Sequence, residues 1–75
     1  MDDRTKELIA IGCSVTANCH PCVTHHVNQA RVLGLEDEAI NQAVRIGLMV
    51  RKGAAGEMDN LLKTLTGVNH TDRPG

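Results

Sequence analysis

The chain contains no phenylalanine, tyrosine or tryptophan, and this absence limits what it can fold into more than any other feature. Aromatic side chains normally supply the largest units of buried apolar area, so the core has to be built from Leu, Ile, Val, Met and Ala. A chain of 75 residues also buries only about 60% of the surface that it exposes when unfolded. Chains of this size usually need a disulfide, a metal or a partner subunit to be stable. We therefore expect one domain that buries further apolar surface by forming a homo-oligomer.

The charges are nearly balanced, with 8 Lys and Arg against 9 Asp and Glu. Because there is no basic stripe and no aromatic side chain for base stacking, we expect no nucleic-acid partner. No apolar run approaches the ~20 residues needed to cross a bilayer, so we expect no membrane partner. The N-terminus is polar and acidic, unlike a secretory signal, and a cytoplasmic location is expected. Thiols in that compartment are mostly reduced, so a close cysteine pair indicates redox catalysis or metal binding.

Apolar residues at helical spacing predict an all-α fold of about four helices, and no alternating pattern long enough for a β-strand is present. The first helix is expected to run from about residue 3 to residue 16. The second has Pro21 in its first turn and stops at Gly34, a residue type that often follows a helix end. The third begins in the acidic segment 36–38 and closes before Gly53.

The fourth predicted helix has apolar residues at i, i+3, i+4 and i+7 and ends at Gly67. Residues 1–67 would then form one helical domain. The polar segment 68–75, which includes His70, is expected to be a disordered tail. The third helix has a broader apolar face than a small monomer can bury, which again indicates a subunit interface.

Two cysteines, Cys19 and Cys22, lie three residues apart at the expected start of the second helix, a spacing that predicts two sulfurs within disulfide reach. The positive end of that helix favours a thiolate in its first turn, and a protonated His20 would favour it further. Since the thiolate is the nucleophile in disulfide exchange, Cys22 is a candidate reactive sulfur. The simpler interpretation is that both cysteines pack as small apolar side chains. Cys13 is expected to be buried in that way, with a role as a third redox thiol or ligand as the less favoured alternative.

His25 and His26 lie three and four residues after Cys22, on the same face of the predicted helix. Either imidazole could accept the thiol proton and return it to a leaving group, and the spacing does not choose between them. We expect one to point toward the core or a partner and the other toward solvent. Glu7 could orient such an imidazole if packing brought the two together. Taken alone, Glu7 is more simply interpreted as an exposed acid near a helix N-terminus.

Two other classes of function fit the same residues. Cys19, Cys22 and His26, with His25 or Glu7, offer ligands suited to Zn²⁺ or copper, and a site of this kind would be completed across a subunit interface. The other class is a non-catalytic oligomeric module that keeps the dithiol without much turnover. Weak reactivity toward peroxides, despite a reducible cysteine pair, would indicate such a module.

Four of these residues form the pattern Glu7-x11-Cys19-x2-Cys22-x3-His26. This pattern resembles the motif of AhpD-like alkylhydroperoxidases, which belong to the carboxymuconolactone decarboxylase superfamily. The similarity covers about residues 4–66. A motif with three fixed spacings is more specific than a C-x-x-C pair alone, and it favours a functional role for Glu7 over the simpler interpretation.

The resemblance implies an all-helical unit that forms trimers or hexamers with active sites near subunit contacts. Cys22 would be the attacking thiolate and Cys19 its resolving partner, while His26 and Glu7 would relay the proton. The substrate would be a hydroperoxide or a disulfide, and a dithiol donor, either a dihydrolipoyl group or a partner protein, would restore the thiols without any cofactor. Pro21 stands where peroxidase members often have His. Because the decarboxylases that name the superfamily lack the dithiol, lactone decarboxylation is not implied.

Overall fold

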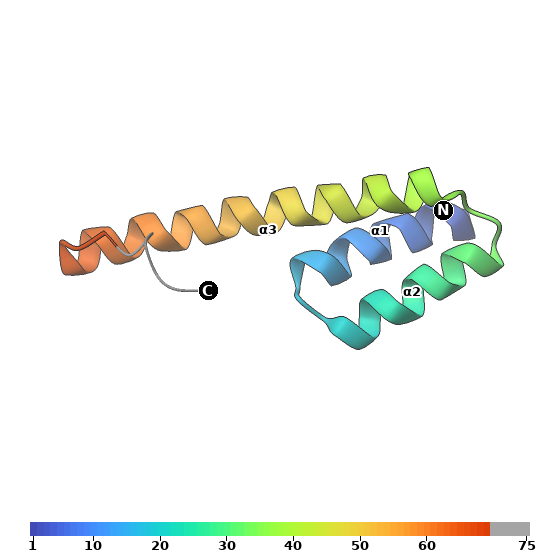
Figure 1. Ribbon diagram of the computed structural model, residues 1–75, viewed down its shortest axis with the longest axis horizontal. Coiled ribbons are helices and arrows are strands. Elements are labelled where there is room, and N and C mark those ends of the chain that lie inside the picture. Colours follow the sequence, from blue (N-terminus) through green and yellow to red (C-terminus); the bar gives the residue numbers. More distant parts are fainter. Residues whose placement is uncertain (70–75) are drawn as a thin grey trace.

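The computed structural model describes residues 1–69, which contain three helices and no strand. The helices are α1 (Asp3–Thr16), α2 (His20–Val32) and α3 (Asp37–Thr66). Helix α1 packs against both of the others and lies between them, and the C-terminal half of α3 extends beyond α1 and α2 (Figure 1). The predicted all-α class is confirmed. The greater part of the expected tail, residues 70–75 with His70, lies outside the described residues.

The connection between α1 and α2 is short because Asn18 adopts the left-handed conformation, with a φ of 56°. Its N–H donates to the carbonyl of Val15, and the N–H of Cys19 donates to the carbonyl of Ser14, at 3.1 and 3.0 Å. This pair of bonds is a Schellman cap, which satisfies carbonyls at the end of α1. Asparagine is one of the few residues other than glycine that adopt this conformation readily. The cap therefore ends α1 and delivers Cys19 to the N-cap position of α2.

Helix α2 ends in the same kind of cap, built on Gly34 with a φ of 80°. The N–H of Gly34 donates to the carbonyl of Arg31, and the N–H of Leu35 donates to the carbonyl of Ala30. The prediction that the second helix stops at Gly34 is confirmed. The cap turns the chain back so that α3 can pack along α1.

The predicted separation of a third and a fourth helix at Gly53 is wrong, because α3 is one continuous helix of 30 residues. Neither Gly53 nor Gly56 has the positive φ that ends a helix. A glycine inside a helix costs only about 1 kcal/mol relative to alanine, whereas proline costs about 3 kcal/mol. The two glycines therefore weaken α3 without stopping it. The predicted end at Gly67 is confirmed: its φ is 73° and its N–H donates to the carbonyl of Lys63.

The hydrophobic core is small and lies along α1. Its buried members are Ile11, Ala30, Ile40 and Ala43. The half-buried side chains packed against them are Leu8, Val27, Leu35 and Val44. Helices α1 and α3 approach closely at Gly12 and Gly47, where a Cβ on Gly47 would lie 2.6 Å from the carbonyl oxygen of Gly12. Thr16 joins the two helices by donating its hydroxyl to the carbonyl of Gly47 at 3.0 Å. No helix within residues 1–69 has the length and apolar character needed to span a membrane.

Candidate functional site

The two cysteines of the C-x-x-C pair are joined by a disulfide between Cys19 and Cys22, with their Cα atoms 5.3 Å apart. Cys19 is the N-cap residue of α2, and Cys22 lies in its first turn after Pro21. Both residues are half-buried, so the sulfurs lie close to the surface. The prediction that the spacing brings the sulfurs within disulfide reach is confirmed. The pair occupies the end of α2 at which unpaired N–H groups favour negative charge.

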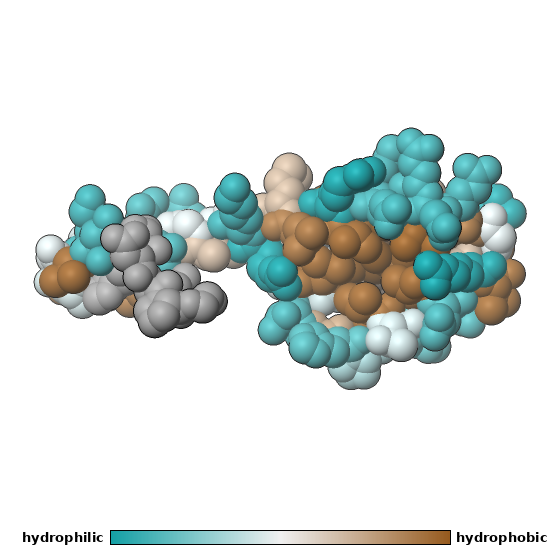
Figure 2. Space-filling model, in the orientation of Figure 1, coloured by the Kyte–Doolittle hydropathy of each residue, from teal (hydrophilic) through white to brown (hydrophobic). Residues whose placement is uncertain are grey.

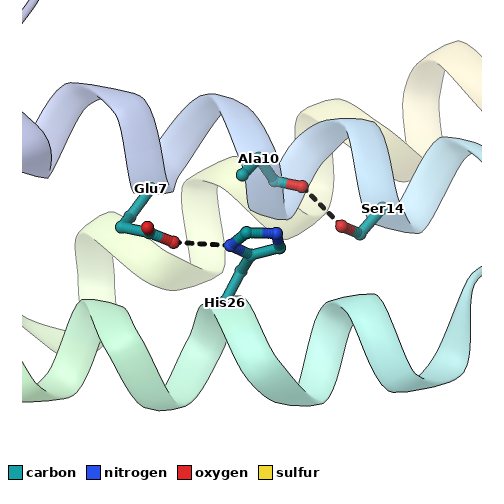
Figure 3. A network of polar contacts seen from close by, with 4 residues as sticks. All are labelled: Glu7, Ala10, Ser14 and His26. Carbon is teal, nitrogen blue, oxygen red and sulfur yellow. Dashed lines mark hydrogen bonds and ion pairs between the residues drawn. The ribbon is translucent and has the colours of Figure 1, made fainter.

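Glu7 and His26 are brought together where α1 packs against α2 (Figure 3). The Oε2 atom of Glu7 lies 2.6 Å from the Nδ1 atom of His26. Glu7 is only 7% exposed, so its interpretation as an exposed surface acid is wrong. A carboxylate buried without a partner would be costly, and this hydrogen bond supplies the partner.

The contact also determines which nitrogen of the ring is available for proton transfer. An ionised carboxylate can only accept a hydrogen bond, so the Nδ1–H of His26 donates to Glu7. Nε2 then remains as the proton acceptor of the neutral ring. Figure 3 shows this second nitrogen directed away from Glu7, on the side where Ser14 lies. Cys22 precedes His26 by four residues and therefore lies on the same face of α2, one turn closer to its start.

The expected division between the two neighbouring histidines is confirmed. His26 is half-buried against α1, whereas His25 is exposed. The two rings contact each other edge to face, with centroids 4.9 Å apart and an interplanar angle of 72°. His20, the first residue of α2, is also exposed. Of the three histidines near the dithiol, His26 is therefore the one with a buried carboxylate partner.

Ser14 is a site residue that the sequence reasoning missed. It is 6% exposed, and its Oγ donates to the carbonyl of Ala10 at 2.6 Å. Ser14 also lines a pocket of about 330 Å³ beside Cys19. The available signal was its spacing, because Ser14 follows Glu7 by seven residues and two helical turns place both on one face.

Arg51 of α3 is a second missed residue, and it lines the same pocket beside Cys19. Its Nη1 donates to the carbonyl of Val15 at 3.4 Å and to the Oδ1 atom of Asn18 at 3.3 Å. Arg51 therefore supports the turn that carries the dithiol. No local pattern could have identified this residue, since only the packing of α3 on α1 brings it to the turn.

The prediction that Cys13 is buried is wrong. Cys13 is a free, exposed thiol that lines a groove between α1 and α3. It lies two residues from both the buried Ile11 and the buried Val15, and therefore on the opposite side of α1 from them. A helix contacted on two sides leaves such a side uncovered, and the spacing of the apolar residues already places Cys13 there.

The metal-site alternative requires several donor side chains that lie close together. No group of three or more His, Cys, Asp and Glu side chains among residues 1–69 is arranged to hold a metal ion. The sulfurs of Cys19 and Cys22 are bonded to each other, and Nδ1 of His26 is engaged by Glu7. A metal site completed across a subunit interface stays a prediction.

Residues 1–62 match the carboxymuconolactone decarboxylase family. A curated relative from Paracoccus denitrificans, "Uncharacterized protein 4 in cox locus", is 38% identical over 55 residues, which are 73% of this chain and 50% of the relative. The chain thus spans about half the length of the curated relative that it matches. No solved structure matches the chain significantly. Since the family match covers most of the chain and all of α1 and α2, the protein belongs to the carboxymuconolactone decarboxylase family.

Proposed function

We propose that this protein is a thiol–disulfide oxidoreductase of the alkylhydroperoxidase type, in which Cys19 and Cys22 alternate between dithiol and disulfide. The observation that carries the proposal is the Glu7–His26 hydrogen bond, one helical turn from a disulfide at the positive end of α2. The match to the carboxymuconolactone decarboxylase family supports the same function. A structural disulfide would not need a buried carboxylate and imidazole beside it.

In the first step, Nε2 of His26 accepts the thiol proton of Cys22, and Glu7 stabilises the imidazolium through Nδ1. The thiolate then attacks one oxygen of a hydroperoxide. The new S–O bond forms a sulfenic acid while the O–O bond breaks, and the departing alkoxide takes the proton from His26 to leave as an alcohol.

In the second step, the thiolate of Cys19 attacks the sulfur of the sulfenic acid. The S–S bond forms, the S–O bond breaks, and the hydroxide leaves with a proton as water. An external dithiol, such as a dihydrolipoyl group or a partner protein, reduces the disulfide by two successive exchanges and becomes a disulfide itself. When the substrate is a disulfide, attack by Cys22 gives a mixed disulfide that Cys19 resolves in the same way.

The test is a single-turnover measurement on the reduced chain of residues 1–75. One equivalent of cumene hydroperoxide is added, and intact mass and peptide mapping follow the oxidation with time. We expect a loss of two hydrogens per chain, mapped to Cys19 and Cys22. The same reaction is run on a peptide of residues 17–24, which contains the two thiols but neither Glu7 nor His26.

The proposal requires the folded protein to react much faster than the peptide with the hydroperoxide or with a disulfide such as oxidised lipoamide. General acid–base assistance of this kind typically contributes about 10²- to 10⁴-fold. Equal rates for protein and peptide with both oxidants would show that the fold adds nothing to the thiols. The non-catalytic oligomeric module would then be the better description.

A further inference from the structure

The C-terminal half of α3, residues 52–66, extends beyond the other helices, and we refer to it as the arm (Figure 1). Three of its large apolar side chains are exposed, namely Met58, Leu61 and Leu65, at 54%, 51% and 71%. Their spacing of three and four residues places them on one face of the helix. An isolated helix of this length is marginal in water, and an amphipathic helix gains most of its stability by packing its apolar face.

A groove of about 660 Å³ lies between α1 and the first half of α3. No charged residue lines it, and its walls include Ile9 and Cys13 of α1 and Ile46 and Val50 of α3. Three of these large side chains are about half exposed, namely Ile9, Ile46 and Val50, at 50%, 57% and 48%. Figure 2 shows apolar surface gathered over this part of the molecule. The groove is therefore a second uncovered apolar surface on the same chain.

The two surfaces lie on a common side of α3. Gly47 and Val50 of α3 line the groove. Counted from Val50, steps of four, seven and four residues along the helix lead to Ala54, Leu61 and Leu65. These steps keep all five positions on one face. Two α3 helices laid antiparallel would each place their arm against the groove half of the other.

The dimensions agree with that arrangement. At 1.5 Å per residue the arm is about 22 Å long and α1, which forms one wall of the groove, is about 21 Å long. A helix about 10 Å across, covered along half its circumference over that length, buries roughly 350 Å² of its own surface. Two arms in two grooves would bury roughly 1,400 Å² in total, within the range of about 1,200–2,000 Å² of specific interfaces. One arm in one groove would give only half of that area, below the range.

We infer that the arm docks in the groove of a second copy of this chain and that the exchange is reciprocal. The two α3 helices then run antiparallel about a two-fold axis, and no arm and no groove is left uncovered. This two-fold pair goes beyond the redox function proposed above and does not depend on it. A hexamer can be built from three such pairs, whereas a trimer would leave one arm and one groove without a partner.

Cys13 in the groove wall offers a direct test, because it is the one thiol outside the disulfide. Met58→Cys and Leu61→Cys are prepared separately, with Asn60→Cys as a control on the opposite face of the arm. Each ¹⁵N-labelled variant is mixed with its unlabelled form, refolded and mildly oxidised, and the disulfide-linked peptides are identified by mass spectrometry. We expect a peptide pair joining Cys13 to position 58 or 61 that contains one labelled and one unlabelled chain.

Such a link cannot form within one chain. Position 61 lies about 21 Å further along α3 than Gly47, which contacts α1 near Cys13. The inference would be overturned if neither variant gave a disulfide-linked peptide pair with one labelled and one unlabelled chain. It would also be overturned if Asn60→Cys gave such pairs in equal yield, even if the protein is oligomeric. A wild-type monomer in light scattering would overturn it as well.

A second measurement examines both sides of the interface. Leu61→Asp on the arm and Ile46→Asp in the groove should each disrupt the pair. The mass that light scattering gives for either variant should then be lower than that of the wild type. Lys63→Asp, on the opposite face of the arm, should leave the mass unchanged. An unchanged mass for Leu61→Asp or Ile46→Asp, in a variant that circular dichroism shows to be helical, would contradict the docking of arm in groove.

Discussion

The Oε2 atom of Glu7 lies 2.6 Å from the Nδ1 atom of His26, and this bond joins α1 to α2 next to the dithiol. The contact fixes the orientation of the ring and leaves its Nε2 atom outside the bond. The bond therefore links the packing of two helices to the chemistry of the proposed site.

Replacing Glu7 by Gln should slow the oxidation of the reduced pair by roughly tenfold or more, as expected when about 1.4 kcal/mol of transition-state stabilisation is lost. Gln keeps a hydrogen-bonding group in place but removes the negative charge that stabilises imidazolium. The measurement is the single-turnover rate with cumene hydroperoxide near neutral pH. Glu38→Gln, in the exposed first turn of α3, serves as the control. An unchanged rate in Glu7→Gln would remove Glu7 from the relay.

The two cysteines should behave differently when replaced one at a time. Cys22→Ser should abolish reactivity because the attacking sulfur is gone. Cys19→Ser should accumulate a sulfenic acid after hydroperoxide, or a mixed disulfide after a disulfide substrate, because nothing resolves it. Trapping with dimedone and intact-mass analysis distinguish these products. Similar residual activity in the two variants would refute the division of roles.

Asn18 should tolerate Gly but not Val, because its φ of 56° is strained for a β-branched residue. We expect Asn18→Val to lower the free energy of unfolding by about 1–2 kcal/mol. Asn18→Val should also slow the oxidation of the dithiol, because Cys19 is the next residue in the chain. Asn18→Gly should stay close to the wild type in both respects. Urea unfolding at matched protein concentration gives the comparison, and equal stability of the two variants would argue against the cap.

Two glycines of α3 should respond in opposite directions to replacement by alanine. A Cβ at Gly47 would lie 2.6 Å from the carbonyl oxygen of Gly12, whereas Gly56 has no atom within 4 Å of that position. Gly47→Ala should therefore cost about 1–3 kcal/mol through overpacking. Gly56→Ala should gain about 1 kcal/mol from helix propensity. The thermal midpoints of the two variants should move apart, and a shift in the same direction would contradict the close approach of α1 and α3.

The stability that the N-cap of α1 gives to the fold should depend on pH, because the capping residue is Asp2. Its Oδ1 accepts the N–H of Thr5 at 2.8 Å, and hydrogen bonding to Thr5 lowers the pKa of Asp2 below its usual 3.8. Because the folded-state pKa is lowered, the ionised cap stabilises the fold above pH 3.8 and loses that effect as the pH falls through the folded value. Asp2→Ala should therefore be less stable than the wild type at pH 7, and the difference should shrink toward pH 3. Asp2→Asn, which keeps a capping oxygen without charge, should vary less with pH.

The sequence was most informative where the signal is local. The ends of the helices at Gly34 and Gly67 were predicted because glycine is the residue type that most often adopts the left-handed conformation of a helix cap. The division at Gly53 failed for the opposite reason, since the same residue type can remain inside a helix at modest cost. Cys13 was misplaced because its residue type is often buried, whereas the helical period of Ile11 and Val15 puts position 13 on the opposite side of α1.

The candidate site was predictable only in part. The C-x-x-C spacing at a helix start placed the sulfurs together without any knowledge of the fold. The contact of Glu7 with His26 depends on the packing of two helices, and only the resemblance to a known motif suggested it. Arg51 was out of reach altogether, because it approaches the dithiol turn through the packing of α3.

All four motif residues belong to α1, α2 and the turn between them, and the turn itself is held by two backbone hydrogen bonds within this hairpin. The long third helix supplies Arg51 and a packing surface but none of the proposed reacting groups. The hairpin therefore holds all of the proposed reacting groups. A designer could graft it onto another helical scaffold that buries the face of α1 packed against α3, and the four motif residues would be transferred together.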